Sequence, residues 1–192
     1  MYEATNNILK WAEKIEGSNA AEWDRLPEIY LYMDQVLTYM DKQLHLFERD
    51  ENACLLTSSM INNYVKDGFL PRPTQKKYSR EHLAILTVVC LLKQVLSIQD
   101  IAFLIRTLLK NASKQEMYNR FCAVQSDALH EVCERIKTAS PQGEAELMRL
   151  VIELSVEANA RRTASERIRS EISREEKKQA ETEHMQEKGK KK

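Results

Sequence analysis

TSSMINNYVKDGFLPRPTQKKY, residues 57–78, is the stretch around which the rest of the chain is organised. Thr57 and the two serines after it are favoured N-cap residues, and the apolar residues that follow recur at helical spacing. Gly68 stands where a helix ends in a left-handed residue, and the two prolines beyond it prevent the helix from resuming. A short basic loop with an aromatic residue at its base comes next. The stretch therefore predicts a helix over Ser58–Asp67, then a turn and a basic hairpin.

Helix, glycine turn, proline-bounded basic loop and aromatic base follow one another in the order of a winged helix-turn-helix. Tyr64, the turn Gly68-Phe69-Leu70-Pro71 and the loop ending in Tyr78 resemble the DNA-binding domain of MerR-type regulators. The longer string from LYMDQV at residues 31–36 to LSIQDI, which ends at Ile101, is similar to a bacterial family of formerly unknown function. Members of that family are regarded as MerR-like transcription regulators. The resemblance covers residues 26–110.

The resemblance implies a winged helix-turn-helix with two further helices after the wing, and DNA as the partner. One position departs from the pattern. MerR-type proteins usually carry an arginine two residues before the tyrosine of the recognition helix, and this chain has Asn62 there. The DNA contact made by that arginine therefore cannot be transferred to this position.

Composition favours a helix-rich intracellular protein. Of the 192 residues 30% are charged and 7% aromatic, and no stretch approaches the about 18 consecutive apolar residues of a membrane span. The first residues lack the basic and apolar regions of a secretory signal, so we expect a cytoplasmic protein without a membrane partner. Four cysteines, at positions 54, 90, 122 and 133, form no CxxC pair and predict free thiols.

Charge is distributed unevenly although the net charge is zero. Residues 1–56 carry 5 basic and 11 acidic side chains, whereas residues 57–82 carry 5 basic and 2 acidic ones. Residues 161–192 are again basic, with 11 basic and 7 acidic side chains. Local sign matters more than total charge for nucleic-acid binding, so the positive potential lies on the expected winged helix and on the tail.

The remaining sequence predicts helices with clear boundaries. We expect helices over Asn6–Ile15 and over Glu28–Glu48, the second with Pro27 in its first turn and with Ile29 and Tyr32 on its apolar side. Capping serines predict three more, and the last helix follows a break at Ser140-Pro141-Gln142-Gly143. The three capping residues are Ser79, ahead of a helix that is apolar nearly all round, Ser97 and Ser113.

These elements predict an all-α fold with a small β-wing, divided into four parts. Residues 1–25 form an N-terminal helical extension and residues 26–110 the MerR-like winged helix-turn-helix. Residues 111–172 form a C-terminal helical hairpin that dimerises, because helices with a single apolar stripe must bury it against something. Residues 173–192 form a charged tail, expected to be frayed or disordered.

The candidate DNA contacts are polar or basic side chains of the helix and the wing. They are Ser58, Ser59, Asn62, Asn63, Lys66, Arg72, Lys76, Lys77, Tyr78 and Arg80. Asn62 and Asn63 are suited to reading adenine edges, but asparagine also serves as a local turn or cap residue. Tyr64 and Tyr78 are more often packing residues than stacking partners of bases, and a cluster of five basic residues also occurs on ordinary surfaces.

Catalysis and cofactors are not expected. The chain has no glycine-rich phosphate loop, no HExxH and no GxSxG. His130 and Cys133 share a helical face, but Cys122 lies about 16 Å of helix rise from Cys133, too far to share a metal within one chain. A metal site across a dimer is conceivable, as in metal-sensing MerR relatives, but buried structural thiols are favoured.

The sequence thus predicts a sequence-specific, dimeric DNA-binding transcription regulator. We expect a repressor, because the C-terminal region leaves little room for a ligand-binding domain; any small-molecule effector stays open. Two alternatives remain: a helical protein-interaction module whose wing is only a loop, and a chromosome- or phage-associated DNA-binding protein without regulatory output.

Overall fold

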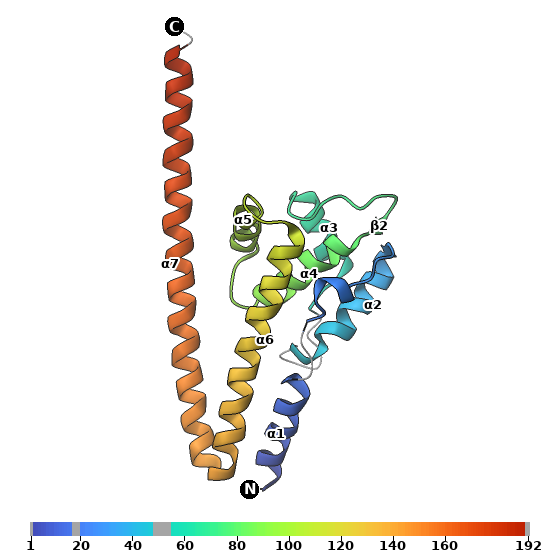
Figure 1. Ribbon diagram of the computed structural model, residues 1–192, viewed down its shortest axis with the longest axis vertical. Coiled ribbons are helices and arrows are strands. Elements are labelled where there is room, and N and C mark those ends of the chain that lie inside the picture. Colours follow the sequence, from blue (N-terminus) through green and yellow to red (C-terminus); the bar gives the residue numbers. More distant parts are fainter. Residues whose placement is uncertain (1, 17–19, 48–54, 191–192) are drawn as a thin grey trace. The chain divides into compact units, whose positions relative to one another are not determined.

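The computed structural model describes residues 2–16, 20–47 and 55–190 and is mostly helical with one small antiparallel sheet (Figure 1). The chain divides into two units, Met1–Leu147 and Met148–Lys192. Its helices, short 3₁₀ helices (η) and strands are, in chain order, α1 (Tyr2–Glu16), η1 (Trp23–Arg25), β1 (Leu31–Tyr32), α2 (Met33–Leu44), η2 (His45–Phe47), α3 (Ser58–Lys66), β2 (Lys77–Tyr78), α4 (Arg80–Leu92), α5 (Ile98–Leu108), α6 (Lys114–Ala139), η3 (Ser140–Gln142) and α7 (Glu144–Lys190). Within the described ranges, no helix is both long and apolar enough to span a membrane.

The expected helix over Ser58–Asp67 is confirmed as α3, and both of its ends are closed as the sequence suggested. The Thr57 hydroxyl accepts a hydrogen bond from the Met60 backbone N–H at 3.2 Å. At the other end Gly68 has a φ of +71°, and the backbone N–H of Phe69 donates to the Tyr64 carbonyl. The Phe69 ring packs edge-on against Tyr64, with ring centroids 5.6 Å apart. Local interactions therefore determine where α3 starts and stops.

The helix expected over Glu28–Glu48 is wrong at its start. Residues 28–30 are not helical, and β1 pairs antiparallel with β2, with Leu31 opposite Tyr78 and Tyr32 opposite Lys77. Helix α2 begins only at Met33. Just before it, the Tyr32 backbone N–H donates a hydrogen bond to the Gln35 side-chain oxygen at 2.9 Å. The run Ile29-Tyr30-Leu31-Tyr32 has high strand propensity, and β2 offers it a hydrogen-bonding partner. Pairing with the wing therefore prevails over helical periodicity.

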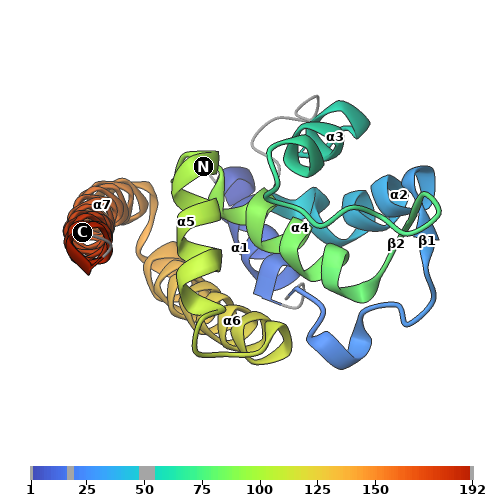
Figure 2. The ribbon, with the colours of Figure 1, turned by 90° about the horizontal axis from the view of Figure 1, so that it is seen from above.

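The core of the first unit is built on α4, which is buried from His82 to Cys90 as its apolar sequence predicted. Helices α2, α3, α5 and α6 surround it (Figure 2). Its largest fully buried side chains are Met40, Leu44, Ile61, Leu70, Leu83, Leu86, Ile101 and Tyr118. The expected caps at Ser97 and Ser113 are confirmed, since each hydroxyl accepts a backbone hydrogen bond at 3.2 Å.

Helix α6 is covered within its own chain, contrary to the expectation that its apolar stripe needs a second copy. Its N-terminal part belongs to the core through Met117, Tyr118 and Cys122. Its C-terminal part packs on α1, where Cys133 donates to the Ala12 carbonyl at 3.4 Å. The stripe is therefore satisfied by α4 and α1.

Helix α7 differs from expectation at its end. The break at residues 140–143 is confirmed, with Gly143 at a φ of +100°, and α7 begins at Glu144 as predicted. It continues to Lys190, although a frayed or disordered tail was expected from residue 173. Ion pairs one turn apart, such as Arg162 with Glu166 at 2.9 Å, support a helix in this charged sequence.

Candidate nucleic-acid interface

Helix α3 presents a polar surface opposite its packing side. Ile61 and Tyr64 are buried against the core, so the helix has a fixed orientation. The exposed side carries short polar side chains and one lysine: Ser58, Ser59, Asn62, Asn63 and Lys66. In Figure 1, α3 and β2 lie at the opposite end of their unit from α1, so this surface is not covered by the N-terminal helix. Hydroxyls, amides and an ammonium group are thus available for hydrogen bonding.

The wing is a tight turn that exposes basic side chains. Thr74 bridges to Lys77, whose backbone N–H donates to the Thr74 carbonyl at 2.9 Å. The two residues between them, Gln75 and Lys76, have φ values of 50° and 62°, as in the two-residue turn that suits the twist of a hairpin. Arg72 and Lys76 are exposed, whereas Lys77 is half-buried and its Nζ lies 5.2 Å from the centre of the Tyr32 ring.

Two of the ten candidate contacts are committed to other interactions. Tyr78 is only 3% exposed, burial raises the pKa of its phenol, and its ring packs edge-on against His82. It therefore supports the wing from inside. The Arg80 side chain is 18% exposed, pairs with Glu28 at 3.0 Å and lies over the Trp23 ring. The Glu28 carboxylate offsets the positive charge of Arg80. Tyr78 and Arg80 therefore do not belong to the exposed polar surface of α3 and the wing.

His82 joins the wing to the start of α4. Its Nδ1 accepts a hydrogen bond from the Ser79 backbone N–H at 3.0 Å, so the proton of a neutral ring is on Nε2, which donates to the Pro71 carbonyl at 3.2 Å. Burial lowers the pKa of the imidazole, against a smaller opposing effect of the Pro71 hydrogen bond. A neutral histidine thus fixes both ends of the wing loop.

Sequence reasoning missed an exposed aromatic surface beside the wing. Ile29, Tyr30 and Tyr32 are 70%, 58% and 49% exposed, although Ile29 and Tyr32 were expected on a buried helix face. Leu31, between the tyrosines, points inward. This alternation is the signature of a half-buried strand, and the strand propensity of residues 29–32 is the signal that could have revealed it.

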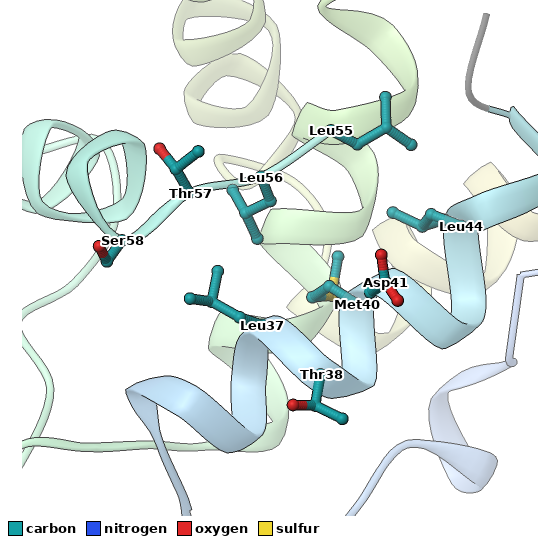
Figure 3. A pocket seen from close by; sticks show the side chains of 9 residues that line it. All are labelled: Leu37, Thr38, Met40, Asp41, Leu44, Leu55, Leu56, Thr57 and Ser58. Carbon is teal, nitrogen blue, oxygen red and sulfur yellow. The ribbon is translucent and has the colours of Figure 1, made fainter. Parts of the chain in front are cut away.

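A pocket lies behind the first turn of α3 (Figure 3). Its volume is about 450 Å³, and its lining consists of Leu37, Thr38, Met40, Asp41, Leu44, Leu55, Leu56, Thr57 and Ser58. Aliphatic side chains dominate, and Asp41 is the charged member of the lining. The pocket meets the polar surface of α3 at Ser58. The expected end of a helix at Glu48 and the Cys54 thiol fall outside the described ranges.

The three residues weighed for a metal site, Cys122, His130 and Cys133, do not come together in the described part of the chain. Within the described ranges Cys90, Cys122 and Cys133 form no disulfide and are buried, and burial raises the pKa of Cys122 and Cys133. His130 instead pairs with Glu16 at 2.8 Å. Lys137 bridges Glu16 and Glu134 at 2.7 and 2.8 Å, and together with His130 these groups make an ion-pair network that joins α1 to α6.

Comparison with known proteins identifies the family. A family model described as a domain of unknown function, DUF1836, matches residues 21–122, which is more than half of the chain. The chain belongs to the DUF1836 family. None of the curated proteins and none of the solved structures matches it. The DUF1836 match begins before η1 and ends inside α6, so the polar face of α3, the wing and the aromatic surface at residues 29–32 all lie within the family domain.

Proposed function

We propose that this DUF1836 protein is a sequence-specific DNA-binding transcription regulator with a MerR-like winged helix-turn-helix. The observation that carries the proposal is the combination of α3, whose ends are capped and whose outer side is polar, with an adjoining wing whose basic residues are exposed. The order of α2, α3, wing, α4 and α5 supports it, as does the local excess of positive charge over residues 57–82.

In this proposal α3 enters the major groove and the wing grips the neighbouring backbone. The Asn62 and Asn63 amides have the donor and acceptor pair that matches an adenine edge, and one such bidentate contact discriminates between bases by about 1–3 kcal/mol. Lys66, Arg72 and Lys76 contribute phosphate contacts that position the protein without reading sequence. Arg80 and Tyr78 act indirectly, by supporting the base of the wing.

We further propose that the regulator is a dimer and acts as a repressor by occupying its operator. Helix α6 packs on α1 and α4 within its own chain, whereas α7 carries a group of exposed apolar side chains. They are Met148, Val151, Ile152, Val156, Ile168 and Ile172. Two copies of α7 associating through these side chains would present two recognition helices to a two-fold operator.

A gel-retardation assay with the DNA upstream of the protein's own gene tests the function, because small regulators often bind their own promoters. If the residues of two wings and two α3 helices neutralise about six to ten phosphates, affinity should fall by roughly 10³–10⁵ between 50 and 200 mM salt. Lys76→Ala/Lys77→Ala should weaken binding to all sequences alike and flatten the salt dependence. Lys10→Ala/Lys14→Ala, on exposed positions of α1, is the matched control and should bind like the unmodified protein.

Absence of DNA binding at low salt would contradict the proposal. The alternative is then a protein-interaction module, which the exposed apolar side chains of α7 favour. Binding without preference for the upstream DNA would instead indicate a chromosome- or phage-associated DNA-binding protein without regulatory output.

A further inference from the structure

The two-stranded sheet has an outer face that the recognition helix and the wing tip do not account for. Leu31 and Tyr78, which are paired, point into the core, so their neighbours point away from it. Tyr32 and Lys77 are the outward pair, and the Lys77 ammonium lies 5.2 Å from the centre of the Tyr32 ring. Tyr30, just before β1, is also exposed. Figure 2 shows β1 and β2 side by side next to α2 and α4.

Tyr30 also lines a cleft that it shares with the wing. The cleft has a volume of about 600 Å³ and is lined by Glu28, Tyr30, Pro71, Arg72, Thr74, Ser79, Arg80, Glu81 and His82. Its two carboxylates have cationic partners, since Glu28 pairs with Arg80 and Glu81 with Lys114. Arg72 is exposed, and its positive charge is opposite to the negative charge of a phosphate. An anionic backbone is therefore compatible with the cleft.

Scattered exposed apolar residues are normal on a protein surface, but two exposed tyrosines beside a basic loop form a surface of defined chemistry. A phenol donates a hydrogen bond to a phosphate oxygen, and its ring offers an apolar face to a sugar. Lys77, held over Tyr32, adds a positive charge at the same place. Duplex DNA carries a phosphate and a sugar at every step along the edge of its groove.

We propose that Tyr30 and Tyr32 contact the sugar–phosphate backbone of the duplex beside the groove that the wing grips. This inference rests on the proposed DNA-binding function and extends the interface from α3 and the wing to residues 30–32. Because phosphates carry no sequence information, the two tyrosines contribute affinity and orientation rather than base discrimination. Lys77 is thereby assigned a double role, as a phosphate contact and as the support of the Tyr32 ring.

The first arm of the test removes only the hydroxyl groups. Tyr30→Phe and Tyr32→Phe in the full chain should each lower the affinity roughly three- to tenfold on upstream and on random DNA alike, as expected for one lost hydrogen bond. Thermal unfolding should be unchanged, because both side chains are exposed. Tyr39→Phe, in which the hydroxyl is buried in α2 without a hydrogen-bond partner, is the matched control and should bind DNA normally.

The second arm detects proximity directly. A photo-crosslinking benzoylphenylalanine at position 30 of the full chain should form an adduct with labelled DNA. The same residue at Val124, which is exposed on α6, should form none. If the unmodified protein binds DNA but position 30 gives no adduct and both phenylalanine variants bind normally, this inference is overturned while the DNA-binding function stands. An adduct with a second copy of the chain in place of DNA overturns it as well. If the unmodified protein binds no DNA, both proposals fail together.

Discussion

At the scale of single residues, His82 connects chemistry to the shape of the wing. Its imidazole accepts from the Ser79 backbone N–H and lies within hydrogen-bonding distance of the Pro71 carbonyl, so it closes the loop that carries Arg72 and Lys76. Protonation would place a hydrogen on Nδ1 and remove the acceptor that Ser79 uses. It would also leave a charge in a buried position. The wing is therefore best held when this histidine is neutral.

Stability should consequently depend on pH through His82. Burial lowers its pKa in the folded state below the unfolded value of about 6.5, so its contribution is fully present above that pH and is lost as the pH falls through the folded pKa. Denaturant unfolding at pH 7.5, 6.5 and 5.5 should show a declining free energy of unfolding. His82→Asn should be less stable at pH 7.5 and lose most of this dependence, whereas His45→Asn, at an exposed position, should retain it. If the free energy of unfolding of the unmodified protein did not change with pH, this role of His82 would be refuted.

At the scale of the elements, α6 is the helix whose place differs most from expectation. The sequence suggested a DNA-binding domain over residues 26–110, with the helices of residues 111–172 devoted to dimerisation. Tyr118 is instead fully buried in the main core, its hydroxyl donates to the Ala21 carbonyl at 2.7 Å, and its ring packs edge-on against Trp23. The first helix of the C-terminal region is therefore part of the domain that carries the proposed DNA-binding surface.

Removing this packing should unfold the domain. Tyr118→Ala should lower the free energy of unfolding by about 3–5 kcal/mol, as for other large buried aromatic side chains. Tyr30→Ala, which removes an exposed tyrosine, is the matched control and should change it by less than about 0.5 kcal/mol. A fragment of residues 1–110 should lack a cooperative transition in circular dichroism, whereas residues 1–147 should retain one. Cooperative unfolding of the shorter fragment would show that α6 is dispensable.

At the scale of the whole molecule, the proposed dimer depends on α7. Met148, Ile152 and Val156 follow one another at four-residue steps and are exposed, so they lie along one side of α7. A long helix that leaves such side chains in water is expected to bury them against another surface. A symmetric second copy is the commonest solution, and it would double the basic surface that faces DNA.

The dimer can be tested without shortening the chain. Ile152→Glu/Val156→Glu should convert the protein from dimer to monomer in sedimentation experiments and weaken operator binding, because only one recognition helix then engages the DNA. Ala158→Glu/Ser165→Glu adds the same charges at exposed positions on the opposite side of α7 and should leave the dimer intact. A monomeric unmodified chain, or a dimeric Ile152/Val156 variant, would exclude assembly through these side chains.

Local signals in the sequence were sufficient to locate most helices and the part of the proposed interface that lies on α3. Thr57 and Gly68 close α3 through bonds within a few residues of themselves, so reading the caps located the recognition helix and its exposed asparagines. The apolar run that became α4 predicted burial on every side, and it is buried from His82 to Cys90. Such features depend on neighbours along the chain, which is why they are visible without the fold.

Tertiary structure decided what depends on distant partners. The strand at residues 31–32 exists because residues 77–78 pair with it, and this pairing exposes Tyr32 where helical periodicity had suggested burial. The same folding pairs Arg80 with Glu28 and buries Tyr78, although both looked like surface contacts in the sequence. The stripe of α6 is covered by α1, about 120 residues earlier in the chain. A single sequence records which side chains seek burial or a charge partner, but only the three-dimensional arrangement determines which partner they meet.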